Sequence, residues 1–153
     1  MIITFIGHSS VAFHQSVKES VKKIIKSNLI NVEYITCYLG SYGDFDNICA
    51  YACKELKQQY KNIEIAYVTP YISLIEQEKI KKIQACGLYD ISIYPPIENT
   101  PPKFAILKRN EWMIANADLV IAYVCRSYGG AYKAMQLAKK MNKKIINVYD
   151  LTQ

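Results

Sequence analysis

The stretch Asp118–Lys140 reads DLVIAYVCRSYGGAYKAMQLAKK and decides the fold class. Its apolar run, Leu119–Val124, is typical of a strand that is buried on both faces of a parallel sheet. Two adjacent glycines, Gly129 and Gly130, separate this run from an amphipathic segment with helical spacing. The stretch therefore predicts a strand, a glycine-containing turn and a helix, which together form part of a βαβ unit.

The same alternation of apolar runs and amphipathic segments extends over the whole chain. We expect strands close to residues 2–6, 33–39, 63–68, 89–95, 118–124 and 144–148, and helices close to residues 16–29, 45–60, 73–85, 103–117 and 129–142. The prolines of residues 95–102 predict an extended loop. This order predicts an α/β fold of three layers, in which helices cover both faces of a mostly parallel sheet. We expect one domain, residues 1–153.

Composition and charge are those of a globular protein. About half of the 153 residues are hydrophobic (51%), and the formal net charge is +6. No apolar run approaches the roughly 18 residues that a membrane-spanning helix requires. The N-terminal MIITFIGHSS lacks the basic start of a signal peptide. We therefore expect a soluble, cytoplasmic protein that does not contact membranes.

Five cysteines are spread along the chain: Cys37, Cys49, Cys53, Cys86 and Cys125. None forms a CxxC pair, and both histidines lie near the N-terminus, so the spacing does not resemble a zinc site. Reduced, mostly buried thiols are the expectation. We predict neither a bound metal nor a cofactor.

Glycines and polar residues follow several of the predicted strands. In a parallel sheet the carboxyl ends of the strands meet at one edge, where ligands of α/β proteins bind. This rule selects Gly7, His8, Ser9, Ser10, Gly40, Ser41, Tyr42, Gly43, Asp44, Thr69, Pro70, Arg126, Ser127, Tyr128, Gly129 and Gly130. Glycine and hydroxyl residues allow main-chain N–H groups to approach a phosphate at a helix N-terminus, so we expect an anionic ligand at this edge.

The glycine pair allows two interpretations. Gly129 and Gly130 can form a tight turn from strand to helix, or they can admit a ligand close to the main chain. The flanking Arg126 and Ser127 suit an anion and favour the second interpretation.

Other candidate residues also have two interpretations. Asp44 and Asp46 either cap the helix that follows them or bind ribose hydroxyls. His8 either packs under the crevice, lines it with a polar group, or acts as a general acid–base. Tyr42 and Tyr132 either pack or stack on a base.

Five segments in a fixed order carry a family resemblance. They are GHSS (7–10), LGSYGDFD (39–46), LKRNEWMIANADLVIAYV (107–124), GGAYKAMQLAKK (129–140) and KIINV (144–148). They resemble the SLOG superfamily, which includes the Smf/DprA proteins, the Lonely Guy phosphoribohydrolases and many small bacterial and phage proteins. The resemblance implies a Rossmann-like fold that binds a nucleotide or nucleotide-derived molecule over the Gly7, Gly40 and Gly129 loops.

The Lonely Guy motifs are matched only in part. Arg109 matches the catalytic arginine of an RKxxM helix, and Asn110 replaces the lysine. The two adjacent glycines of PGGxGTxxE are present, but Tyr132, Lys133 and Gln136 stand where the third glycine, the threonine and the glutamate would be.

The missing glutamate bears on catalysis. Glutamine can hydrogen-bond a ribose hydroxyl but cannot accept a proton at neutral pH. Cleavage of an N-glycosidic bond would benefit from another carboxylate. The candidates are Asp44, Asp46 and Glu98.

The sequence is compatible with three functions. The first, favoured by the missing glutamate, is binding without turnover of a nucleotide or an ADP-ribose-derived signal, by a sensor or a sponge in phage defence or anti-defence. The second is hydrolysis of a nucleoside monophosphate, as in the Lonely Guy enzymes. The third is single-stranded nucleic-acid binding, as in DprA. The sequence disfavours nucleic acid as a partner, because no element interleaves Lys or Arg with aromatic residues. The apolar side of the last predicted helix leaves room for a homodimer.

Overall fold

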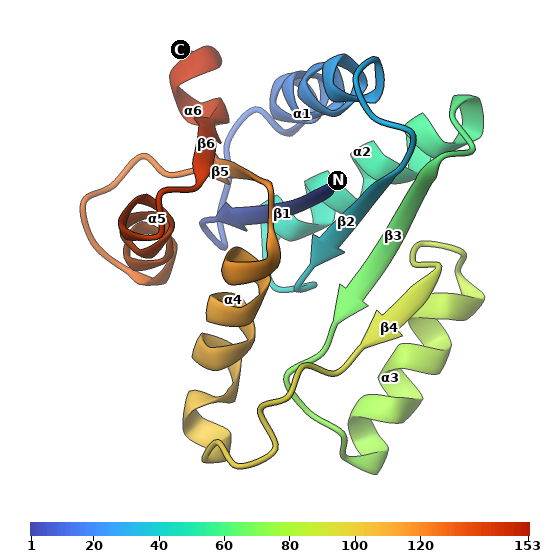
Figure 1. Cartoon of the computed structure of the whole chain (residues 1–153), viewed down its shortest axis with the longest axis vertical. Coiled ribbons are helices and arrows are strands. Elements are labelled where there is room, and N and C mark those ends of the chain that lie inside the picture. The colour runs from blue at the N-terminus through green and yellow to red at the C-terminus, as the bar shows by residue number, and fades with distance from the viewer.

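A parallel sheet of six strands forms the centre of the molecule (Figure 1). The computed structural model describes all residues from 1 to 153, and the strand order is β4-β3-β2-β1-β5-β6. The strands are β1 (Ile2–Gly7), β2 (Ile35–Leu39), β3 (Ile63–Val68), β4 (Ile91–Ile93), β5 (Leu119–Tyr123) and β6 (Lys144–Asn147). Every neighbouring pair is parallel.

Helices cover both faces of this sheet. They are α1 (His14–Leu29), α2 (Asp44–Gln59), α3 (Leu74–Ala85), α4 (Ala105–Asn116), α5 (Gly130–Lys140) and α6 (Val148–Leu151), with a 3-10 turn η1 (Pro102–Phe104) before α4. Helices α1 and α2 pack together on one face, and α4 and α5 pack together on the other. The expected three-layer, Rossmann-like α/β fold is therefore confirmed.

The core has two parts because the sheet is buried on both sides. Ile3 and Phe5 of β1 point into the larger cluster with α1 and α2, whereas Ile6 belongs to the smaller cluster with α4 and α5. Strand β5 is buried along its whole length. Coverage of both faces explains why Leu119–Val124 is continuously apolar rather than alternating.

Two elements differ from the sequence prediction. Strand β4 has only three residues, because it is an edge strand that pairs with β3 alone, and Tyr89, which was expected in this strand, packs into the larger core before it begins. The chain also ends in the short helix α6, which was not expected and which places Val148 in the larger core beside α1.

The central strand β1 lies where the direction of chain progression reverses. From β1 the chain runs outward through β2, β3 and β4, and later returns to the other side of β1 as β5. Such a switch point opens a crevice at the carboxyl ends of the central strands. The loops after β1, β2 and β5 meet there. None of the helices has the length and apolar character that a bilayer crossing requires.

Candidate ligand-binding site

A cavity of about 350 Å³ lies at this switch point, between the carboxyl edge of the sheet and the helices α4 and α5. Eleven of the residues selected from sequence line it: Gly7, His8, Ser9, Gly40, Tyr42, Asp46, Arg109, Asn110, Arg126, Gly129 and Gly130. The remaining wall was not predicted and consists of Thr4, Phe5, Ile6, Ile106, Met113, Ile114, Ala131 and Ala134. A cavity of this size suits a small molecule, and its wall combines apolar surface with a few polar groups.

The N-terminus of α5 forms one end of the cavity. Gly129 precedes the helix with φ 89° and ψ 178°, a conformation that residues other than glycine rarely adopt, and no side chain caps the helix. The first amides of a helix have no acceptor within it. A Cβ atom on either glycine would meet no atom within 4 Å, so the main chain is open to solvent at this point. These uncapped amides and the helix dipole together favour an anion.

His8 fixes the loop that carries Arg126. The N–H of Cys125 donates to Nε2 of His8 at 3.1 Å, which places the proton of the neutral ring on Nδ1. Burial, and then the charge of Arg126, lower the pKa of His8, so the ring is neutral at pH 7. This hydrogen bond makes His8 a support for the loop. The Arg126 guanidinium itself lies 5.2 Å from the ring centre of the exposed Tyr128 and has no acidic partner.

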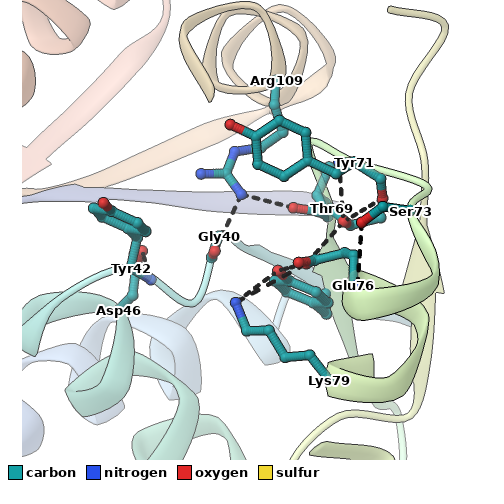
Figure 2. A network of polar contacts seen from close by, with 11 residues as sticks. Gly40, Tyr42, Asp46, Thr69, Tyr71, Ser73, Glu76, Lys79 and Arg109 are labelled. Carbon is teal, nitrogen blue, oxygen red and sulfur yellow. Dashed lines mark hydrogen bonds and ion pairs between the residues drawn. The ribbon is translucent and has the colours of Figure 1, made fainter. Parts of the chain in front are cut away.

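Arg109 is buried, contrary to the usual position of an arginine in a helix. Its side chain is only 2% exposed, and its Nη1 donates to the carbonyl oxygens of Gly40 at 3.1 Å and Val68 at 2.8 Å. Its Nε donates to Oδ1 of Asn110 at 2.8 Å. These bonds connect α4 to the carboxyl ends of β2 and β3. Figure 2 shows the guanidinium reaching down between Asp46 with Tyr42 on one side and Glu76 on the other.

Asp46 is the one acidic side chain in the cavity wall. Its Oδ2 accepts a hydrogen bond from the main-chain N–H of Tyr42 at 2.8 Å, which closes the loop between β2 and α2. Burial raises the pKa of Asp46 from 3.8 to about 6, although the Tyr42 N–H and the charge of Arg109 oppose this rise. The carboxylate is thus ionised but poorly solvated at neutral pH.

Ten candidate residues lie outside this cavity: Ser10, Ser41, Gly43, Asp44, Thr69, Pro70, Ser127, Tyr128, Tyr132 and Gln136. Ser10, Ser127 and Gln136 are exposed, Tyr132 is half-buried and Pro70 is buried. Ser41 lines a separate shallow groove beside α3, with Tyr89. Gln136 therefore does not occupy the place in the wall that the motif comparison gave it.

Neither aspartate in the first turn of α2 is a helix cap. Gly43 occupies the cap position, and no side chain bonds to the first amides of α2. Asp44 instead accepts a hydrogen bond from Val11 N–H at 3.0 Å and lies 3.5 Å from His14 Nε2. Asp44 thus connects the loop after β1 to α2, whereas Asp46 faces the cavity. Glu98, the third candidate carboxylate, is exposed and lies outside the cavity wall.

Gly7 has a packing role that the sequence did not reveal. A Cβ atom at this position would lie 2.2 Å from the ring of Phe45, which is buried at the start of α2. The glycine is therefore required by the approach of α2 to β1, and its place in the cavity wall follows from that packing.

A buried polar network beside Arg109 was also missed (Figure 2). Glu76 of α3 accepts hydrogen bonds from Tyr67 at 2.5 Å and Thr69 at 3.0 Å, and Lys79 lies 3.9 Å away. Burial and Glu76 raise the pKa of Tyr67. The spacing Ser73-x-x-Glu76 is a signal of a helix start, and Ser73 does accept from Glu76 N–H. That signal gave no indication that the carboxylate turns inward.

Comparison with solved structures identifies a protein of similar fold. The chain superimposes on DNA processing protein A (DprA) from Helicobacter pylori with a TM-score of 0.61 and 18% sequence identity, over 95% of this chain and 63% of that one. The chain thus spans less than two thirds of its neighbour. No protein-family model and no curated protein matches it. The shared fold is the one expected from the resemblance to the SLOG superfamily, whose Smf/DprA branch includes this neighbour.

This neighbour corrects one prediction. The DprA structure is described for its single-stranded DNA binding mode. The sequence-based expectation that nucleic acid is disfavoured as a partner is therefore wrong. That expectation required cations and aromatic residues on one element, whereas a parallel sheet brings them together from separate loops. Here Tyr42 follows β2, and Arg126 and Tyr128 follow β5.

Proposed function

We propose that the cavity binds a nucleotide or a nucleotide-derived small molecule without converting it. The observation that carries the proposal is the convergence of an uncapped helix N-terminus, two arginines and one carboxylate on a single cavity of about 350 Å³. Arg126 and Arg109 outnumber Asp46, and the helix dipole adds positive potential, so the cavity favours an anionic ligand that also carries neutral polar groups.

The phosphate belongs at the α5 end of the cavity. The amides of the first turn of α5 and the unpaired Arg126 supply hydrogen-bond donors there, and the open surface around Gly129 and Gly130 admits a tetrahedral anion. The opposite end contains Asp46, whose negative charge repels a phosphate. The difference in charge between the two ends of the cavity orients the ligand across the carboxyl ends of β5, β1 and β2.

The base belongs at the mouth, against Tyr42. Its side chain is 66% exposed although it lines the cavity, so an aromatic face is available for stacking. Arg126 and the exposed Tyr128 form a second stacked pair, at the α5 end of the cavity.

The proposal that the ligand is not converted rests on the residue that stands where the Lonely Guy motif has its glutamate. The residue at the motif position, Gln136, cannot accept a proton and faces solvent. Asp46 is the carboxylate on which hydrolysis of an N-glycosidic bond in this cavity would depend. Binding without turnover and hydrolysis are distinguished by whether the ligand is released intact or cleaved.

The test measures that fate. The native protein is incubated with a panel of nucleoside monophosphates and ADP-ribose, desalted and denatured, and the released molecules are identified by mass spectrometry. The proposal expects a bound nucleotide that is released unchanged. Arg126→Ala should lose it, whereas Lys23→Ala, which removes an exposed lysine of α1 outside the cavity, should retain it. Release of free base and sugar phosphate would instead demonstrate hydrolysis.

Single-stranded DNA binding is the second candidate, favoured by the DprA neighbour. The same cavity would hold one nucleotide of the strand, while Arg126 and Tyr128 contact the next one. Fluorescence anisotropy with a labelled oligonucleotide measures this binding directly. Affinity that falls steeply with salt, together with displacement by a mononucleotide, would place the strand in the cavity.

A further inference from the structure

Asp46 and Arg109 each retain an unused polar group that belongs to the cavity wall. Oδ2 of Asp46 accepts from Tyr42 N–H, and no protein donor bonds to Oδ1. Nη1 and Nε of Arg109 are fully engaged, and no protein acceptor bonds to Nη2. Figure 2 shows that the guanidinium approaches the Asp46 side of the site from above. The cavity thus offers one acceptor and one donor from different elements.

Both groups are held rigidly. Arg109 is almost completely buried and is bonded to the main chain of β2 and β3, so its remaining N–H groups have a fixed direction. Asp46 is fixed by its own loop. Rigid polar groups discriminate between ligands because they cannot turn to water or to another partner when the matching ligand group is missing.

From this arrangement, and resting on the proposed function, we infer that Asp46 and Arg109 read the adjacent 2′- and 3′-hydroxyls of a ribose, so that the site selects ribonucleotides over 2′-deoxyribonucleotides. The 2′-hydroxyl donates to the Asp46 carboxylate and the 3′-hydroxyl accepts from Arg109. A hydroxyl can donate and accept, whereas a phosphate only accepts at neutral pH and would face the carboxylate without a bond. A 2′-deoxyribose offers one hydroxyl and leaves one of the two protein groups without a partner.

The order of the strands supports this assignment. Asp46 follows β2, the phosphate-binding end of the cavity follows β5, and β1 lies between them. Strands in a sheet are about 4.8 Å apart, so the two ends are separated by about 10 Å. A 5′-nucleotide that spans from β5 towards β2 therefore presents its sugar hydroxyls to Asp46 when its phosphate lies at α5.

The experiment compares affinities by isothermal titration calorimetry. The titrants are the four ribonucleoside 5′-monophosphates and their 2′-deoxy counterparts, and the proteins are wild type, Asp46→Asn and Asp44→Asn. The Asp46→Asn side chain can still accept from Tyr42 N–H, so the loop is retained. Asp44→Asn removes the same charge from the same helix turn but lies outside the cavity wall.

The wild type should bind the preferred ribonucleotide about 10- to 100-fold more tightly than its 2′-deoxy form, as expected for a hydrogen bond to a charged group. In Asp46→Asn this ratio should fall towards one, mainly through weaker binding of the ribonucleotide, and in Asp44→Asn it should be unchanged. If the wild type bound ribonucleotides and 2′-deoxyribonucleotides with equal affinity, the inference would be overturned but the nucleotide site would stand. The same holds if Asp46→Asn and Asp44→Asn reduced the affinity ratio equally. Failure to bind any of the eight titrants would overturn the inference, whereas the proposed function is overturned only if ADP-ribose also fails to bind.

Discussion

Replacing Asp46 by asparagine should stabilise the ligand-free protein while it weakens ligand binding. Folding raises the pKa of this carboxyl from 3.8 to about 6, because the site removes water from the ionised group. One pKa unit corresponds to about 1.4 kcal/mol, so the ionised Asp46 lowers the free energy of unfolding by up to about 3 kcal/mol above pH 6. Asparagine has the shape of the protonated acid and avoids this cost.

The sign of the pH dependence follows from the raised pKa. Below pH 3.8 the carboxyl is protonated in both folded and unfolded chains, and the cost is absent; it grows as pH rises towards 6 and is then constant. The gain of Asp46→Asn should therefore be largest at pH 7 to 8, shrink between pH 6 and 4, and vanish below.

Urea denaturation at several pH values measures this effect. At pH 7.5 a gain of about 3 kcal/mol in the free energy of unfolding should also raise the melting temperature, measured by thermal unfolding, by roughly 6 to 12 °C for a chain of this length. Glu98→Gln, which removes an exposed carboxylate outside the cavity, is the control and should change stability by less than about 0.5 kcal/mol. An Asp46→Asn protein that is less stable than the wild type, or a difference that does not vary with pH, would refute the reasoning.

Three further substitutions test other parts of the site. Arg109→Ala should lower the free energy of unfolding by about 3 kcal/mol or more, because it leaves the carbonyls of Gly40 and Val68 without their buried donor; urea denaturation measures it, and a loss below about 1 kcal/mol would contradict the buried geometry. Gly129→Ala should cost about 1 to 3 kcal/mol because of its positive φ, whereas Gly130→Ala, equally open but without that constraint, should be neutral within about 0.5 kcal/mol; equal costs would show that space rather than conformation matters. Glu76→Gln should destabilise by about 1 to 3 kcal/mol and accelerate hydrogen exchange in α3, because the buried hydroxyls of Tyr67 and Thr69 lose a charged acceptor; unchanged exchange in α3 would show that the network does not hold this helix.

The carboxyl edge of the sheet could be predicted from sequence because strand ends are local features. Apolar runs determine where β1, β2 and β5 stop, and a parallel arrangement brings the following residues to one edge. This is why His8, Tyr42 and Gly129, which were selected from sequence, line the same cavity. The same reasoning selected Ser127 and Ser10, because it fixes where a loop begins but not which way each side chain in it points.

Arg109 and Gly7 show the limit of that reasoning. The partners of Arg109 are main-chain carbonyls at the ends of two strands, and a carbonyl has no sequence signature. Family resemblance could assign Arg109 to the site, but only the packing of α4 reveals that it is buried. Gly7 is required because the ring of Phe45, which is distant in sequence, packs against it. The sequence alone therefore suggested a ligand-binding glycine where the structure has a packing requirement.

A crystal structure of the protein grown with a saturating ribonucleoside 5′-monophosphate tests the central claim most directly. The account predicts the phosphate against the first amides of α5 and Arg126, with the sugar facing Asp46 and Arg109 and the base beside Tyr42. A nucleotide bound in the reverse direction, or bound outside the cavity between α4 and α5, would contradict it.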